Sequence, residues 1–353
     1  MNVDHTLASL DGLRRFDAII DARSPSEFAH DHIPGAINCP VLDDEERARV
    51  GTLYKQVSPF DARKLGAVMV ARNVANHIET LFADKPKGWK PLVYCWRGGQ
   101  RSGSLSLVLS QIGFRVQVIE GGYQAYRRAV MADLEKLPEG LRFRVLCGKT
   151  GSGKSRLLAA LQSQGAQVLD LEGIANHRGS VLGLVPGQPQ PTQKRFDSVL
   201  WDTLRRFDPG QPVWVESESR KVGELRVPEQ LIHHMRAAPC VRVELSVAAR
   251  VRLLMEDYDF FVNDVPAFCE RLNALRALRG NEVINEWQAA ASSGRIEGVV
   301  EQLLTTHYDP VYLQSMQRNY ADFPSATLVE PPDGDHATLQ EVARSLLMSA
   351  EAG

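Results

Sequence analysis

The stretch Gly148-Lys149-Thr150-Gly151-Ser152-Gly153-Lys154-Ser155 decides the fold of the second half of this chain. It lies between the apolar run RFRVLC at 142–147 and a helical pattern that begins at Lys154, and its spacing is G-x-x-x-x-G-K-[ST]. In such a loop the backbone N–H groups and the helix N-terminus surround a phosphate, the lysine neutralises its charge, and the last hydroxyl can hold Mg²⁺. We therefore predict a diphosphate or triphosphate site at residues 148–155.

Further apolar runs continue an α/β pattern after this loop. Strands are predicted near 166–171, 212–216 and 240–245, and because they alternate with helices a parallel sheet is expected; beyond about residue 246 the pattern is helical. Polar side chains that follow two of these strands fall at the carboxyl edge of the sheet, where such folds bind ligands. They are the candidate substrate-contacting residues Asp170, Glu172, His177, Arg178, Glu216 and Arg220.

Glu216 ends the strand PVWVE, where proteins with this loop often place the acid that orients water or a metal ion. If Mg²⁺ takes part in the reaction, Ser155 and Glu216 are therefore its candidate ligands. The neighbouring Glu218 and Lys221 fit a solvated turn equally well.

The first 140 residues carry a separate α/β pattern. Strands are predicted at 16–21, 91–95 and 115–119, and helices at 104–112 and 122–136. The last helix is followed by Leu137-Pro138-Glu139-Gly140, in which proline and glycine are typical of a helix end and of a linker between domains. With 353 residues, two domains are expected, and we predict them at 1–138 and 139–353.

Cys95 opens a loop in the N-terminal part, Cys95-Trp96-Arg97-Gly98-Gly99-Gln100-Arg101-Ser102, between a predicted strand and a predicted helix. The inward N–H groups of such a loop and the helix dipole stabilise a thiolate or a bound oxyanion. Gly98 and Gly99 let the backbone close around that group, and Arg97 and Arg101 add positive charge. Cys95 is therefore the candidate nucleophile, whereas Cys147, Cys240 and Cys269 are interpreted as small buried hydrophobes.

Composition limits the other functional classes. The chain is 44% hydrophobic and 24% charged with a net charge of −2, so it is globular, and RNA binding would need a local face of arginines. The five cysteines are widely spaced and contain no CxxC pair, which disfavours a disulfide framework and a zinc site. No apolar run approaches the ~20 residues that span a bilayer and no secretory signal is evident, so we expect a cytoplasmic protein without membrane contact.

The N-terminal part resembles the rhodanese family over about residues 4–137. The resemblance rests on Asp21-Ala22-Arg23-Ser24-Pro25-Ser26-Glu27-Phe28, on His32-Ile33-Pro34-Gly35-Ala36 and on Glu120-Gly121-Gly122-Tyr123. It implies that Cys95 carries sulfur or selenium as a persulfide-type intermediate. The loop is one residue longer than in the usual sulfurtransferases and resembles that of rhodanese-fold phosphatases, but Tyr94 stands where those enzymes place a histidine.

A rhodanese-like domain followed by a phosphate-loop domain is similar to the tRNA 2-selenouridine synthase family along nearly the whole chain. The cysteine loop, the segments around Glu172 and 177–180, and Val215–Arg220 carry this likeness. It implies that sulfur is replaced by selenium in the wobble-position 2-thiouridine of tRNA, with selenophosphate as donor. It also implies a geranylated 2-thiouridine made from geranyl diphosphate, and transient contact with a selenophosphate-producing enzyme.

Two other interpretations stay open at the level of sequence. The phosphate loop fits an ATP- or GTP-binding domain that regulates a sulfurtransferase. A noncatalytic rhodanese module is disfavoured because Cys95 is intact. Copurification of tRNA would favour the transferase, and nucleotide hydrolysis without any change in tRNA would favour regulation.

Overall fold

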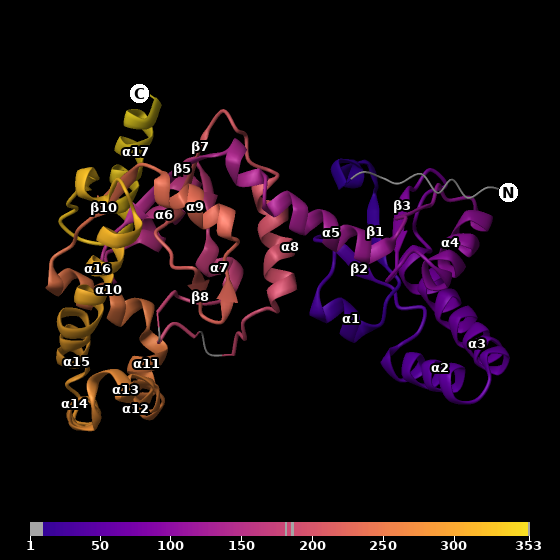
Figure 1. The fold of residues 1–353 in the computed structure, drawn as a ribbon, viewed down its shortest axis with the longest axis horizontal. Helices are drawn as coiled ribbons and strands as arrows, with labels where there is room; N and C mark the ends of the chain where they lie inside the picture. The colour runs from indigo at the N-terminus through magenta and orange to yellow at the C-terminus, as the bar shows by residue number, and fades with distance from the viewer. Residues whose placement is uncertain (1–9, 181, 185–186, 352–353) are drawn as a thin grey trace. The chain divides into compact units, whose positions relative to one another are not determined.

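The computed structural model describes the backbone of residues 10–180, 182–184 and 187–351, and these residues form two compact units. The first unit contains residues 1–133 together with 191–202, and the second contains 134–190 and 203–353. Figure 1 shows the elements of each. In the described part of the chain, no helix has the length and apolar character needed to cross a membrane.

The first unit is built on a parallel four-stranded sheet in the order β2-β1-β3-β4. Apolar side chains such as Ile20 and Val93 fill its core, together with Leu105 of the helix that follows β3. This is the α/β arrangement predicted from sequence. The strands are β1 (Ala18–Asp21), β2 (Ala36–Asn38), β3 (Pro91–Tyr94) and β4 (Gln117–Val118), and the helical segments are η1 (Leu10–Arg15), α1 (Pro25–His30), α2 (Asp44–Gln56), α3 (Pro59–His77), η2 (Ile78–Phe82), α4 (Gln100–Ile112) and α5 (Gly122–Leu134).

Helix α8 (Gln193–Leu204) belongs largely to the first unit although it follows β6 of the second. Arg127 of α5 pairs with Asp197 of α8 at 2.9 Å, and the Trp201 indole N–H donates to Asp133 at 2.8 Å. Ser198 donates to the buried Asp31 at 3.0 Å. The division between the units therefore differs from the linear division at 138/139, which assigns all of α8 to the second domain.

The second unit contains a parallel five-stranded sheet in the order β11-β10-β5-β7-β6. Leu157 of α6, Trp214 of β7 and Leu339 of α17 pack in one core cluster against it. The parallel sheet was predicted, but its edge strand β11 was not, because Thr327–Val329 is short, partly exposed and follows a long helical run. The strands are β5 (Arg142–Cys147), β6 (Gln167–Leu169), β7 (Pro212–Glu216), β10 (Cys240–Val243) and β11 (Thr327–Val329), with a separate hairpin of β8 (Lys221–Val222) and β9 (Leu225–Arg226).

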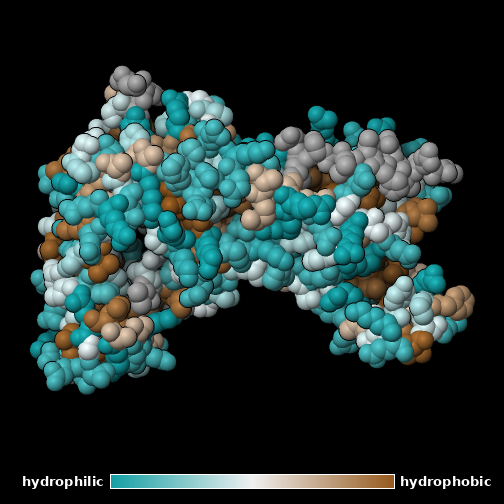
Figure 2. Space-filling view, viewed as in Figure 1, coloured by the Kyte–Doolittle hydropathy of each residue, from teal (hydrophilic) through white to brown (hydrophobic). Residues whose placement is uncertain are grey.

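The helices after β10 form a second apolar cluster in this unit, which includes Phe268, Leu275, Trp287 and Leu303. The visible face of the molecule is mainly hydrophilic, with scattered hydrophobic groups (Figure 2). The helical segments of the unit are η3 (Leu137–Gly140), α6 (Lys154–Ser163), α7 (Leu171–Ala175), α9 (Glu229–Ala237), α10 (Val247–Asp257), α11 (Asp259–Asn263), α12 (Val265–Leu272), η4 (Asn273–Leu275), α13 (Arg276–Arg279), α14 (Asn281–Ser292), α15 (Ile296–Gln302), η5 (Leu303–Tyr308), α16 (Asp309–Asn319), η6 (Phe323–Ser325) and α17 (His336–Glu351).

Candidate functional site

The cysteine loop of the first unit joins β3 to α4, as the sequence predicts. Cys95 follows the last residue of β3, and its Sγ lies 3.1 Å from the Oγ of Ser102 in the first turns of α4. The Ser102 hydroxyl also hydrogen-bonds to the Gly99 carbonyl at 3.1 Å. Gly99 is the N-cap of α4, and no side chain in the described part of the chain caps this helix. The N–H groups of its first turn therefore remain available to an oxyanion near Cys95.

Gly98 of the cysteine loop and Gly122, the first residue of α5, are required by close backbone contact. Gly98 and Gly122 have φ of +69° and +54°. A Cβ on Gly122 would overlap the Cys95 carbonyl oxygen, and one on Gly98 would lie 2.7 Å from the Ile119 carbonyl oxygen. The Tyr123 N–H donates to the Cys95 carbonyl at 2.8 Å. The start of α5 therefore fixes the base of the cysteine loop.

The two arginines of the cysteine loop have different environments. Arg97 donates to the Gln124 side chain at 3.1 Å, whereas Arg101 pairs with Glu27 of α1 at 2.5 Å. Burial raises the pKa of Glu27, but the hydrogen bond and charge of Arg101 outweigh burial, so the net pKa shift is downward. The charge of Arg101 is thus already partly compensated, and a bound oxyanion would share this guanidinium with Glu27.

A buried polar network lies behind this loop. Arg23 pairs with Asp21 at 2.6 Å, and its guanidinium lies 4.0 Å from the centre of the Tyr123 ring. The Tyr123 hydroxyl donates to Asp31 at 2.7 Å. Burial raises the pKa of Asp31, against the effect of its hydrogen bonds with Tyr123 and Ser198. These residues position Tyr123; sequence reasoning contained Asp21 and Arg23 only as part of a family resemblance.

The phosphate loop of the second unit lies between β5 and α6. Gly151 and Gly153 have φ of +78° and +81°, which a glycine adopts without strain. The Lys154 ammonium donates to the Gly148 carbonyl at 2.8 Å. It therefore lies against the phosphate loop, where it can also contact a bound phosphate. Arg250 of α10 is fully buried and donates to the Thr150 carbonyl at 2.8 Å. Arg250 is in turn paired with Asp309 at 2.6 Å, so a residue that sequence reasoning gave no special role holds the outer side of the loop.

A cavity of about 610 Å³ opens in front of the phosphate loop. It is lined by residues 150–155, and the predicted Glu172, Arg178 and Glu216 lie in the same lining. Glu218, for which the sequence fitted a solvated turn equally well, also lines the cavity. Four other predicted residues, Gly148, Lys149, Asp170 and His177, are not in this lining, and neither is Arg220, which is exposed in the turn after β7.

Three of the predicted residues outside the cavity make contacts at the phosphate loop or at the start of α7. The Asp170 carboxylate accepts from the Gly173 N–H at 2.8 Å and so caps α7. Lys149 lies 3.9 Å from Asp309. The Gly148 N–H donates to the Tyr312 hydroxyl of α16 at 2.5 Å. These three residues support the loop and its surroundings in the described structure.

The carboxyl groups in the cavity hold protons more strongly than usual. Burial, followed by the charges of Glu216 and Glu218, raises the pKa of Glu172 to about 9. Burial and then Glu216 raise the pKa of Glu218 to about 7. Burial also raises the pKa of Glu216, although Lys154 and a hydrogen bond with Ser155 oppose this effect. Near neutral pH these groups carry fewer than three negative charges, which reduces repulsion of a phosphate.

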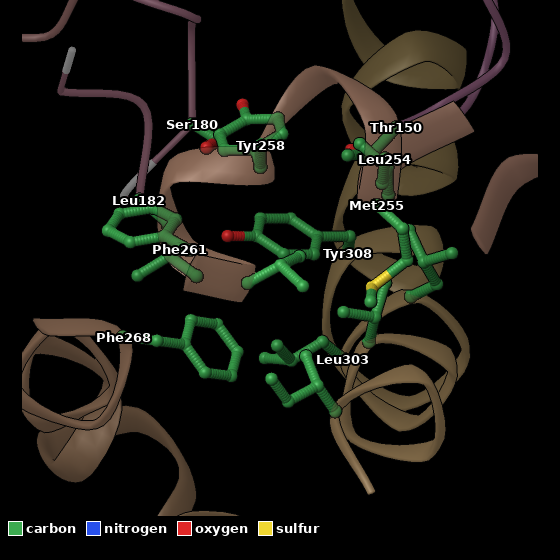
Figure 3. A pocket seen from close by; sticks show the side chains of 14 residues that line it. Thr150, Ser180, Leu182, Leu254, Met255, Tyr258, Phe261, Phe268, Leu303 and Tyr308 are labelled. Carbon is green, nitrogen blue, oxygen red and sulfur yellow. The ribbon is translucent and has the colours of Figure 1, made fainter. Parts of the chain in front are cut away.

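An apolar pocket of about 60 Å³ adjoins the phosphate cavity (Figure 3). Five residues belong to the linings of both the pocket and the phosphate cavity: Thr150, Ser180, Leu254, Tyr258 and Tyr308. The rest of the pocket is apolar, with side chains from α10 to α12, α15 and η5. Sequence reasoning missed this pocket, because helical periodicity shows which faces are apolar but not where the packing between them stays incomplete.

Comparisons with known proteins agree with the two units. Residues 6–129 match the family described as "Rhodanese-like domain", and residues 141–279 match "tRNA 2-selenouridine synthase AAA domain". Proteins described as "tRNA 2-selenouridine synthase" are 32% identical in Nitrosomonas europaea, 32% in Marinobacter nauticus and 33% in Aeromonas salmonicida. These alignments cover 85%, 83% and 84% of this chain and 89%, 87% and 87% of the respective relatives. The chain belongs to the tRNA 2-selenouridine synthase family.

Proposed function

We propose that this protein is a tRNA-modifying transferase of the cytoplasm that converts wobble-position 2-thiouridine to 2-selenouridine with selenophosphate. The reaction proceeds through a geranylated 2-thiouridine made from geranyl diphosphate. The names of the relatives support the overall conversion. The geranylated intermediate and the donor rest on the resemblance described above and on the geometry of the second unit.

The observation that carries this proposal is the junction of a phosphate loop with an apolar pocket. Lys154 and the loop N–H groups offer charge and donors to a diphosphate, and Thr150 of the same loop lines the apolar pocket. A ligand with a diphosphate at one end and a hydrocarbon chain at the other satisfies both surfaces. The polar base and ribose of a nucleoside triphosphate would leave the apolar surface without a suitable partner.

The chemistry of the first step follows from this placement. The thiocarbonyl sulfur of the nucleoside attacks C1 of the prenyl chain, the C1–O bond breaks, and its electron pair leaves with diphosphate. The charge that develops on the diphosphate is stabilised by Lys154 and the loop N–H groups. The nucleoside loses its N3 proton to solvent. In the second step selenium replaces the alkylated sulfur at C2, and this sulfur leaves as a thiol more readily than it would leave from a thiocarbonyl.

Ser155 and Glu216 fit Mg²⁺ in this site. Both residues line the phosphate cavity together with Lys154, and a hydroxyl with a carboxylate and phosphate oxygens is a typical Mg²⁺ environment. The ion would supply additional positive charge to the diphosphate. Within the described residues no group of three or more His, Cys, Asp or Glu side chains forms a metal site, so the phosphate oxygens would complete the ligand set.

In this proposal the Cys95 thiolate attacks the phosphorus of selenophosphate, the Se–P bond breaks, and its electron pair leaves with selenium as hydroselenide. The hydroselenide replaces the alkylated sulfur at C2, and water then releases phosphate from the Cys95 sulfur. The backbone of Gly98 and Gly99, the first turn of α4 and the side chains of Arg97 and Arg101 bind the oxyanion of the donor. The predicted transient contact with a selenophosphate-producing enzyme belongs to this step. Cys39 is a useful contrast in the same unit, since burial raises the pKa of its thiol to about 12 and keeps it protonated.

Nucleoside mass spectrometry tests the proposal with the full chain, 2-thiouridine tRNA, geranyl diphosphate and selenophosphate, each donor being omitted in turn. Without selenophosphate the geranylated nucleoside accumulates, and with both donors 2-selenouridine appears. Lys154→Ala abolishes geranylation, whereas Cys95→Ala geranylates the tRNA but forms no selenouridine. The matched controls Lys221→Ala and Cys39→Ala retain both products.

Two results would contradict these assignments. Geranylation by Lys154→Ala at the wild-type rate would show that the phosphate loop does not bind the prenyl donor. Unchanged tRNA with every donor present, from protein shown to be folded, would favour a sulfurtransferase regulated by ATP or GTP.

A further inference from the structure

The apolar pocket has two chemically different ends (Figure 3). Thr150 and Ser180 lie at one end, where the pocket adjoins the phosphate cavity. Phe268 of α12 and Leu303 of η5 lie at the other. A chain that enters from the phosphate loop therefore meets hydroxyl groups first and a closed apolar surface last.

The closed end is part of a packed core. Phe268 and Leu303 are both buried and belong to one cluster with Leu272, Trp287 and Val299. The Trp287 indole N–H donates to Gln302 at 2.6 Å, directly before Leu303 in the chain. Packed side chains of this kind yield little to an oversized ligand, because additional volume forces strain in their neighbours.

The entrance is held by separate contacts. Arg250 binds the Thr150 carbonyl, and Arg178 donates to the Asp257 carbonyl at 2.6 Å with its guanidinium 4.6 Å from the Tyr258 ring centre. A diphosphate at residues 148–155 consequently has a fixed position relative to the floor of the pocket. The distance from one to the other limits the length of any attached chain.

We propose that Phe268 and Leu303 are specificity-determining residues that set the longest isoprenoid chain the second unit accepts on its diphosphate substrate. This inference rests on the proposed function, because it takes the substrate to be a prenyl diphosphate. The two side chains act through steric exclusion: the nearer part of a chain that fits lies in the phosphate cavity, its far end occupies the apolar pocket, and one isoprene unit more must displace the floor. A single methylene in an apolar pocket already changes discrimination by roughly 10- to 200-fold.

The test measures binding of the S-thiolodiphosphates of dimethylallyl, geranyl and farnesyl chains to the full protein by titration calorimetry. These analogues differ by one isoprene unit each and resist transfer. Wild type binds geranyl tighter than dimethylallyl or farnesyl. Phe268→Leu opens the floor and raises farnesyl affinity relative to geranyl by about tenfold or more. Leu303→Phe adds volume at the floor and lowers the affinity for the geranyl analogue by about tenfold or more relative to the dimethylallyl analogue.

Affinity ratios for one preparation do not depend on the fraction of folded protein, so a destabilised variant remains informative. Phe323→Leu is the matched control: Phe323 is a buried phenylalanine of the same unit outside the pocket lining, and its ratios stay at the wild-type values. Unchanged ratios in both floor variants would overturn the proposal, as would a wild type that binds all three analogues no tighter than inorganic diphosphate. Selective binding with no prenyl transfer to tRNA would instead contradict the proposed function and leave the role of the floor intact.

Discussion

Replacing Arg250 by methionine should lower both the stability of the second unit and its affinity for phosphate. The guanidinium makes bonds of 2.6 and 2.9 Å to Asp309 and one of 2.8 Å to the Thr150 carbonyl. Removing one partner of a buried ion pair typically costs 3–5 kcal/mol, because the other charge stays uncompensated. Since Lys149 lies 3.9 Å from Asp309 and offsets part of that charge, we expect a loss of about 3 kcal/mol for Arg250→Met.

The effect on phosphate binding has a separate origin. Without its donor the Thr150 backbone must be ordered when the ligand binds, and ordering one residue costs about 1–2 kcal/mol. Diphosphate affinity should therefore fall by about 5- to 30-fold. In the double variant Arg250→Met, Asp309→Leu an apolar pair replaces the ions, so most of the stability should return while the affinity stays low.

Urea unfolding followed by circular dichroism measures the first quantity, and calorimetric titration with diphosphate measures the second. Two outcomes would refute this reasoning. One is a loss of unfolding free energy below about 1 kcal/mol for Arg250→Met, smaller than any broken buried pair should give. The other is full recovery of diphosphate affinity in the double variant, which would show that Thr150 needs no anchor.

Three further predictions concern the first unit. A fragment of residues 1–138 lacks α8 and should melt at a lower temperature than the same fragment with a peptide of residues 191–204 added; equal melting temperatures would contradict the role of α8. Gly122→Ala should destabilise the chain by at least about 1–3 kcal/mol and reduce selenation, whereas Gly35→Ala, also at positive φ but with open space around it, should show only the backbone strain, in thermal unfolding and nucleoside analysis. Glu27→Gln should cost about 1–3 kcal/mol at pH 7. The folded-state pKa of Glu27 lies below its ordinary value of 4.5, so this stabilisation is present above about pH 4.5 and is lost as the pH falls through the folded-state pKa. In acid unfolding curves the difference in stability between Glu27→Gln and wild type should therefore vanish. A cost that persists at low pH would exclude the ion pair as its cause.

The sequence is informative wherever a local pattern and the final contacts coincide. The run at 142–155 predicts β5, the phosphate loop and the start of α6 because strand, turn and helix signals adjoin there. Cys95 was placed correctly in a loop between strand and helix for the same reason. Elements that depend on distant partners were missed: β11 pairs with β10 across more than 80 intervening residues, as the register Val241 with Thr327 shows.

The site shows the same limit. Glu218 is polar in sequence, and its place in the cavity lining depends on a distant residue: the hydroxyl of Tyr320, directly after α16, accepts from the Glu218 N–H at 2.9 Å. Arg250 is one of many arginines in sequence and becomes distinctive only through Thr150 and Asp309. The apolar pocket results from the mutual packing of several helices, and no short motif encodes it.

The position of α8 has a consequence for how the protein folds during its synthesis on the ribosome. The first unit includes residues 191–202, so it cannot be completed when Asp133 has been synthesised. At about 5–20 residues per second, the roughly 70 residues that follow take several seconds to add. During that interval the buried Asp31 and Arg127 lack Ser198 and Asp197, and β5, the phosphate loop and β6 are already being made. The unit that starts first therefore finishes only after the other has begun, and nascent chains stalled before residue 191 should expose a surface that chaperones can bind.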